Sequence, residues 1–268
     1  MPTDTAELLE IAQRAARAAA DLLRDRRPPG VLEITATKSS ATDIVTEMDQ
    51  AAERLIVEQI RGARPGDGFL GEEGADDQGT SGLTWVIDPI DGTVNYLYGI
   101  PAYAVSIGVR EGTEVVAGVV CNPVTGETWT ARRGFGAELD GAPIQVSQVT
   151  ELAMALVATG FGYQASRRAR QAEILRTVLP LVRDIRRAGA ASLDLCALSC
   201  GRVDAYYEEG LKPWDLAAGG LVAVEAGATV AEIPGPAGLP ALTVAAPPGL
   251  FDALRQLVTQ ADDAGQVP

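Results

Sequence analysis

WVIDPIDGTVNYLYGIPAYAVSI, residues 85–107, is the stretch that decides how this chain is interpreted. A run rich in β-branched residues ends in Asp88 and Asp91, with a proline between the two carboxylates and Gly92 and Thr93 directly after them. Because proline stiffens a turn, both carboxylates can point at one place just beyond the strand. Glycine lets the backbone approach a ligand closely and leaves amide N–H groups available to an anion. The stretch therefore predicts a strand that ends in a ligand site.

A divalent metal ion is the natural occupant of that site. Two carboxylates held close together raise each other's pKa unless a cation lies between them. The chain contains no histidine, and a set of oxygen ligands favours Mg²⁺, with Mn²⁺ as a substitute, over zinc. The alternative is that DPIDG is only a turn, because Asp, Pro and Gly are common turn residues.

Two further acidic segments support the metal interpretation. FLGEEG, residues 69–74, places Glu72 and Glu73 after a short apolar strand. PWDLAAGGLVAVEAG, residues 213–227, places Asp215 at the start of a helix, where its carboxylate can cap the helix or ligate a metal. Three such segments in one chain favour a shared site.

The composition excludes several kinds of catalyst. Without histidine there can be no Ser-His-Asp triad, no Cys-His pair, no phosphohistidine and no histidine-bound zinc. The formal net charge of -14 argues against direct binding of nucleic acid or of anionic membrane surfaces. A chain of 268 residues with 47% hydrophobic content is long enough for a sizeable core.

The cysteines and the N-terminal sequence favour a cytoplasmic protein. Three cysteines, an odd number, argue against a disulfide framework. Cys196 and Cys200 are interpreted as buried apolar residues on one helix face, with a metal-binding pair as the alternative. The segment TDTAELLE lacks the features of a secretion signal, and no stretch reaches the ~20 apolar residues of a membrane span.

Apolar periodicity predicts a layered α/β (α+β) fold with two sheets between helices. Predicted helices cover 4–26, 47–61, 167–182 and 191–200, a segment from Pro213, and 248–260. Predicted strands cover 83–88, 102–110, 113–123, 127–133, 154–160, 203–208 and 242–246, with a strand and a Ser/Thr-rich loop over 31–46. We divide the chain into an N-terminal half, 1–150, with the main metal motifs, and a C-terminal half, 151–268, with Asp215, together forming one catalytic unit.

These motifs resemble the inositol monophosphatase family over nearly the whole chain. Residues 85–107 match the pattern WxIDPIDGTxNF followed by a proline and SI, with Tyr96 in place of the usual phenylalanine. Residues 214–227 match WDxAAGxxLVxEAG, and both the GEE element and KSSxTDIVTxxD, residues 38–49, are present. The resemblance implies an αβαβα sandwich of the sugar-phosphatase kind and a Mg²⁺-dependent phosphoric monoester hydrolase.

The resemblance also implies roles for individual residues. Two or three Mg²⁺ ions would be held by Glu72, Asp88, the Ile90 carbonyl, Asp91 and Asp215. Thr93 and Asp49 would orient and deprotonate the attacking water, with Glu72 assisting through the third ion. The substrate would contact Asp91, Gly92, Thr93, Gly189, Ala191, Glu208 and Asp215. Lys38, Asp43 and Glu73 are further candidates.

Several substrates fit this resemblance. Inositol 1-phosphate is the first expectation, and fructose 1,6-bisphosphate, a 3′-phosphonucleotide and histidinol phosphate are alternatives. A bisphosphate needs extra basic groups, for which Lys212 and the cluster Arg183, Arg186 and Arg187 are candidates. Those arginines can equally form a solvated helix end or a dimer contact. The resemblance further implies a homodimer and inhibition by Li⁺, and relatives implicated in transcription and ribosome maturation offer a non-catalytic alternative.

Overall fold

Two long helices cover one face of the molecule, and their sequence shows why they form. The structure is a computed structural model that describes residues 4–27, 36–37, 44–45, 47–235 and 239–264. Helix α1 (Thr5–Arg26) begins after Asp4, whose carboxylate accepts hydrogen bonds from the first-turn amides. Its apolar stripe, like that of α2 (Glu47–Ala63), is buried against the neighbouring sheet. Both predicted helices are confirmed.

The first sheet contains eight strands in the order β10-β9-β8-β7-β6-β5-β3-β4. All neighbours are antiparallel except β3 and β5, which run parallel. Because β3 and β5 are parallel, the residues that follow them emerge at the same edge of the sheet. The strands are β3 (Gly68–Gly71), β4 (Asp76–Asp77), β5 (Leu83–Asp91), β6 (Ala104–Glu111), β7 (Glu114–Cys121), β8 (Thr128–Arg132), β9 (Ala137–Leu139) and β10 (Ala142–Pro143).

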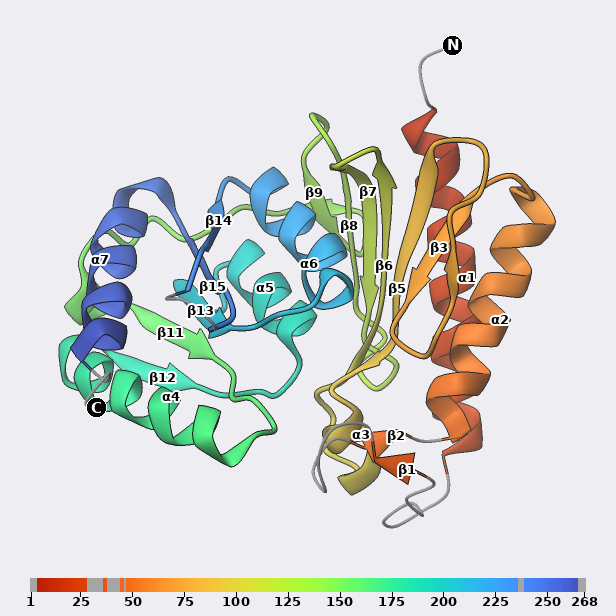
Figure 1. Ribbon diagram of the computed structural model, residues 1–268. Coiled ribbons are helices and arrows are strands. Elements are labelled where there is room, and N and C mark those ends of the chain that lie inside the picture. Colours follow the sequence, from red (N-terminus) through yellow and green to blue (C-terminus); the bar gives the residue numbers. More distant parts are fainter. Residues whose placement is uncertain (1–3, 28–35, 38–43, 46, 236–238, 265–268) are drawn as a thin grey trace.

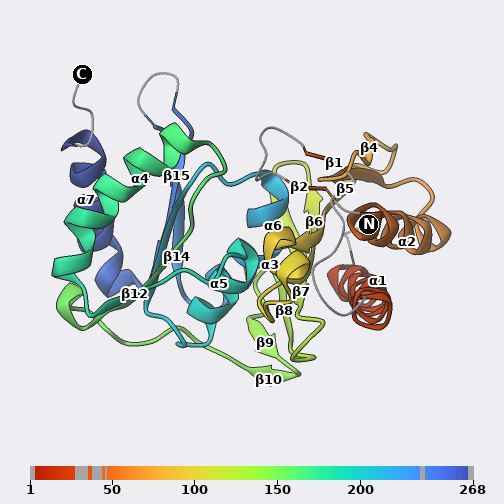
Figure 2. The ribbon, with the colours of Figure 1, turned by 90° about the horizontal axis from the view of Figure 1, so that it is seen from below.

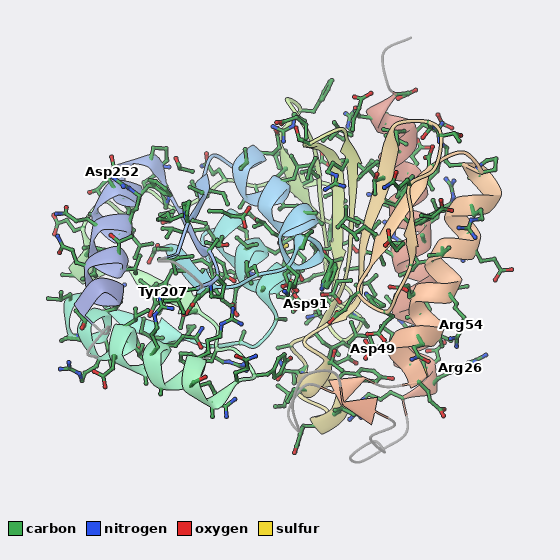
Figure 3. All side chains as sticks on the ribbon, viewed as in Figure 1. Arg26, Asp49, Arg54, Asp91, Tyr207 and Asp252 are labelled. Carbon is green, nitrogen blue, oxygen red and sulfur yellow. The ribbon has the colours of Figure 1, made fainter. Side chains whose placement is uncertain are left out.

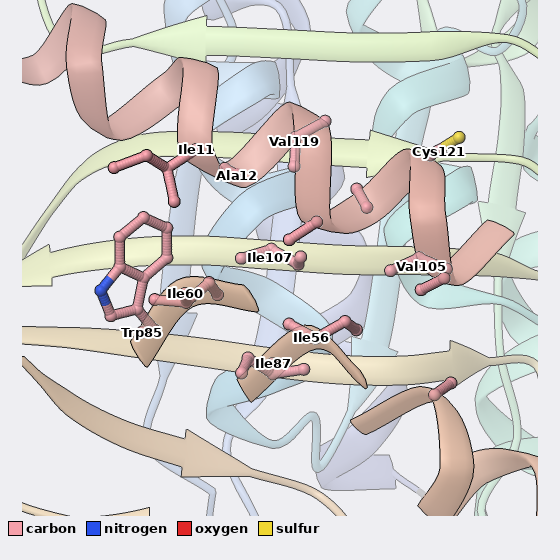
Figure 4. Close-up of a cluster of buried hydrophobic side chains, with 14 of the residues drawn as sticks. Ile11, Ala12, Ile56, Ile60, Trp85, Ile87, Val105, Ile107, Val119 and Cys121 are labelled. Atoms are coloured by element: carbon pink, nitrogen blue, oxygen red, sulfur yellow. The ribbon is translucent and has the colours of Figure 1, made fainter. Parts of the chain in front are cut away.

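The core between this sheet and the two helices is shown in Figure 4. Side chains of α1 and α2, including Ile11 and Ile56, pack with Ile87 and Ile107 of the central strands. Trp85 is fully buried, and its indole N–H donates to Asp67 at 2.9 Å. The strand that carries the metal motif is therefore anchored along its length by apolar contacts.

The second sheet contains five strands in the order β12-β11-β13-β15-β14. Its bounds are β11 (Leu156–Thr159), β12 (Asp184–Arg186), β13 (Ala205–Glu209), β14 (Thr229–Ile233) and β15 (Leu242–Ala246). The helices of this half are α4 (Ala165–Val178), α5 (Ala191–Ser199), α6 (Pro213–Glu225) and α7 (Pro248–Ala264). Helix α6 packs closely on the first sheet, because a Cβ at Gly108 would lie 2.8 Å from the Cβ of Ala217.

Figures 1 and 2 show the five layers. In order they are α1 and α2, the eight-stranded sheet, α5 and α6, the five-stranded sheet, and α4 with α7. The expectation of an αβαβα sandwich is confirmed. The first sheet ends at Pro143 and the second begins at Leu156. We retain 1–150 and 151–268 as a proposed division of one catalytic unit.

Some elements differ from the sequence-based expectation. A short helix, α3 (Thr93–Tyr98), follows β5 and was not predicted. The strands β4, β9, β10, β12 and β14 were not predicted either. Helix α4 ends at Val178, and the short 3-10 helix η2 (Leu179–Leu181) follows it directly. Another short 3-10 helix, η1 (Leu152–Met154), precedes β11. Within the segment 31–46, the structure describes only the strands β1 (Ala36–Thr37) and β2 (Ile44–Val45). None of the described helices combines the length and apolarity that crossing a membrane requires.

Candidate active site

The end of β5 brings Asp88 and Asp91 to one place. Residues three apart in a regular strand face opposite sides, but the pairing of β5 with β6 is irregular between these two aspartates. Asp88 accepts a hydrogen bond from the Ile90 amide at 3.1 Å, which fixes the turn. Gly92 follows with φ of 91°, and a Cβ there would lie 2.9 Å from the Ala102 carbonyl. The chain therefore needs glycine at this position.

Helix α5 holds the Asp91 carboxylate at its N-terminus. The amides of Ala191 and Ser192 donate to Asp91 at 3.2 and 2.7 Å, and the Ser192 hydroxyl donates to it as well. The first amides of a helix have no partner within the helix and carry partial positive charge, so a carboxylate is stabilised there. Ser192 was not singled out from the sequence, because only the fold brings it next to Asp91.

Asp215 both caps its helix and belongs to the acidic cluster. It lies in the first turn of α6, and its Oδ2 accepts a hydrogen bond from the Lys212 amide at 2.6 Å. One carboxylate oxygen from each of Asp88, Asp91 and Asp215 lies within 4.8 Å of the other two. The two alternatives considered for Asp215, helix cap and metal ligand, are thus compatible in one side chain.

The turn after β3 places Glu72 at the same edge of the sheet. The Glu72 amide donates to the Ile87 carbonyl of β5 at 3.1 Å. Glu53 of α2, which is buried, accepts hydrogen bonds from the Glu73 and Ala75 amides, both at 2.9 Å. Glu53 therefore holds the turn that carries Glu72, a role that the sequence did not reveal.

Burial and mutual repulsion raise the pKa of the cluster. The pKa of Asp88 lies well above its usual range because of burial and the nearby charges of Glu72, Asp91 and Asp215. Burial raises the pKa of Asp91 to about 6, against the hydrogen bonds from Ser192. The pKa of Asp215 is raised by burial and by Asp91. A divalent cation would relieve this repulsion, and hard oxygen donors of this kind suit Mg²⁺.

The other residues with expected catalytic roles lie close to the cluster. The Thr93 hydroxyl donates to the Ile90 carbonyl at 3.0 Å. Asp49, in the first turn of α2, is buried, and its charge contributes to the raised pKa of Asp88. Figure 3 labels Asp91 in the middle of the molecule and Asp49 on the α2 side. Lys38 and Asp43 lie outside the described residues.

A cleft of about 710 Å³ opens beside the acidic cluster. It is bordered by the predicted metal and substrate residues Glu72, Asp88, Ile90, Asp91, Gly92, Thr93, Gly189, Ala191, Glu208 and Asp215. Glu208 receives a hydrogen bond from the Tyr206 hydroxyl at 2.8 Å, and burial raises its pKa to about 7. Glu73, a further candidate from the sequence, is not one of the described residues that border the cleft.

The basic side of the cleft differs from the sequence-based expectation. Arg167, Arg170, Arg187 and Lys212 border it, so two arginines were missed. One interpretation of the cluster Arg183, Arg186 and Arg187 was a solvated helix end, and this is wrong. Helix α4 ends at Val178, and Arg186 lies on β12. Arg186 pairs with Asp184 at 2.6 Å on the exposed edge of the second sheet.

The fold and the cleft together define a class: a layered α/β protein with converging buried and partly buried carboxylates suited to divalent metal ions. Comparison with known proteins gives the family. The sequence model of the inositol monophosphatase family matches residues 4–262. The chain belongs to the inositol monophosphatase family, and the resemblance stated from its motifs is confirmed.

Individual relatives agree with this assignment. Inositol-1-monophosphatase SuhB of Mycobacterium tuberculosis is 44% identical over 99% of this chain and 98% of the relative. The solved structure of Mycobacterium tuberculosis SuhB matches with a TM-score of 0.83 at 43% identity, covering 97% of this chain and 98% of that one. Nus factor SuhB of Vibrio cholerae is 40% identical over 85% of this chain and 86% of the relative. The structure of SaIMPase-II with inositol monophosphate bound matches with a TM-score of 0.75 at 25% identity, covering 95% and 98% of the two chains.

Proposed function

We propose that this protein is a Mg²⁺-dependent phosphatase that hydrolyses the phosphate monoester of a small polyol, with inositol 1-phosphate as its first substrate. The observation that carries the proposal is the meeting of Asp88, Asp91 and Asp215, whose carboxylate oxygens lie within 4.8 Å of one another beside an open cleft. Family membership and the similarity to inositol-1-monophosphatase SuhB of Mycobacterium tuberculosis support the choice of reaction.

In this proposal the acidic cluster and its neighbours hold the metal. Glu72, Asp88 and the Ile90 carbonyl would hold one ion, and Asp88, Asp91 and Asp215 a second, with a third ion near Glu72. Bound Mg²⁺ neutralises charge on phosphoryl oxygens and makes water more acidic. Mn²⁺ shares the preference for oxygen ligands and is the expected substitute.

The remaining residues orient the water and the substrate. The Thr93 hydroxyl donates its proton to the Ile90 carbonyl, so its oxygen can accept a hydrogen bond from the attacking water. The buried Asp49 carboxylate would accept the proton of that water. The amides of Gly92 and Thr93 would bind the phosphate, while Gly189, Ala191 and Glu208 would contact the polyol. Glu208 can accept hydrogen bonds from two neighbouring hydroxyl groups.

Phosphate release from a panel of substrates tests the proposal. The panel contains inositol 1-phosphate, fructose 1,6-bisphosphate, a 3′-phosphonucleotide and histidinol phosphate, each assayed with Mg²⁺ and after EDTA treatment. We expect inositol 1-phosphate to be hydrolysed only with the metal, and millimolar Li⁺ to inhibit. Asp91→Asn should lose most activity and keep the far-UV circular dichroism spectrum. Turnover that survives EDTA would contradict the proposed mechanism.

A second function is favoured by one comparison, since the Vibrio cholerae relative is a Nus factor. On this alternative the chain would act through a protein partner of the transcription machinery, because its net charge of -14 disfavours direct contact with nucleic acid. Co-purification of RNA polymerase subunits with both the wild type and Asp91→Asn would support a role independent of catalysis. Sedimentation of the purified chain would test the expected homodimer.

A further inference from the structure

A second cavity, of about 400 Å³, lies between α6, the first sheet and β14. Its α6 wall consists of residues that share one face of the helix: Leu216, Ala217, Gly220, Leu221 and Val224. The facing walls come from β5, β6, β7 and β14, and Figure 1 shows α6 between the first sheet and β14. The volume lies in the range of sites for small molecules.

Two adjacent glycines of α6 have different surroundings. A Cβ at Gly219 would lie 3.1 Å from the Ser192 Cα, so this glycine allows α5 to pack closely. A Cβ at Gly220 would meet only the Leu216 side chain within 4 Å, apart from the backbone of its own helix. Glycine weakens a helix interior relative to alanine, and no neighbouring element requires it at position 220. Gly220 therefore widens the cavity.

The lining of the cavity combines apolar walls with basic side chains. The described residues that line it are mostly apolar, and the charged ones are Arg110, Arg133, Lys212 and Glu232. Three basic groups and one acidic group reverse the balance of a chain whose formal net charge is -14. A ligand with an apolar body and an anionic end would complement such a lining.

Arg110 is the basic residue without a protein partner. It lies on β6, where Val105, Ile107 and Val109 face the core under α1 and α2, so strand alternation turns Arg110 toward α6. Its Nε is buried without an acceptor, and its side chain makes no hydrogen bond or ion pair with any described residue. Because buried donors are nearly always paired, this guanidinium is suited to an anion from outside the chain.

The other charged residues of the cavity are committed or exposed. Arg133 donates from Nε to the Val115 carbonyl at 2.8 Å and pairs with Glu114 at 3.1 Å. Lys212 and Glu232 are exposed, and Glu232 forms no ion pair with any described residue. Arg110 is therefore the group that would decide which anion binds.

We propose that this cavity is a binding site for a small carboxylic acid with an apolar body, anchored by Arg110. The two ends of one guanidinium can donate parallel hydrogen bonds to the two oxygens of one carboxylate. A phosphate dianion would call for more donors than a single uncommitted guanidinium offers. The apolar body would lie against the α6 face at Gly220. The site takes no part in the hydrolysis and does not depend on the proposed function.

A matched pair of probes tests the proposal. 3-Phenylpropionate carries the carboxylate and an apolar ring, and 3-phenylpropionamide is its neutral counterpart. We expect the carboxylate to bind the wild type with a dissociation constant of about 1 mM or tighter, as ligands of this size do. The amide should bind at least about tenfold more weakly, because a hydrogen bond to a charged group changes binding by roughly that factor or more. Ligand-detected NMR titration measures both.

Variants of Arg110 identify the anchor. Arg110→Met should weaken binding of the carboxylate about tenfold or more and leave binding of the amide unchanged, while Arg110→Lys should recover part of the loss. Since Arg110 has no partner to lose, Arg110→Met should keep the melting temperature of the wild type. Arg14→Met, on the exposed face of α1, is the matched control and should bind as the wild type does.

Gly220→Leu tests the location of the site. The added side chain would fill the cavity without changing a charge, and the Leu216 side chain that it meets can move aside. We expect this variant to lose binding of the probe, and we expect Mg²⁺ with inorganic phosphate, which should occupy the cleft, not to displace the probe from the wild type.

Several outcomes would overturn the proposal. Equal affinities for the carboxylate and the amide, or undiminished binding in Arg110→Met, would show that Arg110 is not the anchor. Undiminished binding in Gly220→Leu, or full displacement by Mg²⁺ with phosphate, would place the probe elsewhere. No binding of the carboxylate up to about 10 mM would show that the cavity is not a site of this kind.

Discussion

Asp91 depends on a donor from a distant part of the chain. Its carboxylate is buried, yet three hydrogen bonds from the first turn of α5 stabilise its charged form. The Ser192 hydroxyl is the only one of the three that a single substitution removes without changing the backbone. Because a protonated carboxyl group cannot hold a cation, this hydroxyl should influence how metal binding depends on pH.

Ser192→Ala should therefore move the acid limb of activity to higher pH. Loss of the hydrogen bond raises the pKa of Asp91 above its value of about 6, so protons compete with Mg²⁺ over a wider range. We expect a shift of up to about one pH unit in kcat/KM at subsaturating Mg²⁺. Ser199→Ala, which removes a buried hydroxyl from the same helix that donates to the Cys196 carbonyl, is the control. An equal shift in both variants would contradict this role for Ser192.

Asp194 is a buried carboxyl group that the proposed mechanism does not use. It lies in the first turn of α5, and its Oδ2 has no hydrogen-bond partner among the described residues. Burial, with the charges of Glu208 and Asp91, raises its pKa to about 8. The folded protein thus holds a proton that the unfolded chain releases, so this group stabilises the fold at low pH and loses that effect as pH rises from about 4 to 8.

Asp194→Asn should flatten the dependence of stability on pH. Asparagine carries no charge to bury, so the variant should lose less stability than the wild type between pH 5 and pH 9 in the absence of metal. Thermal unfolding across this range measures the effect. Asp252→Asn, an exposed change on α7, is the control and should follow the wild type. Parallel curves for the wild type and Asp194→Asn would show that the buried carboxyl group has no such influence.

At the scale of the elements, the turn after β3 is held by a helix from another layer. Glu53 of α2 accepts two amide hydrogen bonds from this turn, and the turn carries Glu72 to the cleft. Residues that orient a metal ligand commonly change metal affinity by ~10- to 100-fold when they are altered. The geometry of Glu72 therefore depends on α2 as well as on β3.

Glu53→Gln should weaken the response to Mg²⁺ more than it weakens folding. A glutamine offers one carbonyl oxygen in place of two carboxylate oxygens, so one of the two amides loses its acceptor. We expect the Mg²⁺ concentration for half-maximal activity to rise about tenfold, measured by phosphate release. Glu58→Gln, an exposed change on the same helix, should leave it unchanged. The same Mg²⁺ response in Glu53→Gln and the wild type would rule out this positioning role.

The elements that the sequence predicted well are those with a long buried face. Helices α1 and α2 repeat apolar residues at helical spacing because one face of each packs on the sheet. Two of the missed strands, β12 and β14, lie at the two edges of the second sheet, where little apolar surface is buried. Helix α3 has six residues and starts without a side-chain cap, so neither periodicity nor capping could reveal it.

At the scale of the whole molecule, the acidic cluster joins the two halves of the chain. Asp88 and Asp91 come from the first sheet, while Asp215 comes from the helix layer between the sheets (Figure 1). The metal ligands could be proposed from sequence because acidic motifs and the family resemblance mark them. Ser192 and Glu53 could not, because their contacts are with residues that only the fold brings near.

Because ligands from both halves meet, Mg²⁺ should stabilise the entire fold. A ligand at about 100 times its dissociation constant stabilises the native state by ~2.7 kcal/mol, which corresponds to a rise in melting temperature of roughly 5–10 °C for a chain of this size. The rise should be larger at pH 8 than at pH 5.5, because the raised pKa of Asp91, about 6, leaves it partly protonated at the lower pH. Differential scanning calorimetry with and without Mg²⁺ measures both effects. Asp215→Asn should lose most of the rise, and an undiminished rise in that variant would place the stabilising ion away from the proposed cluster.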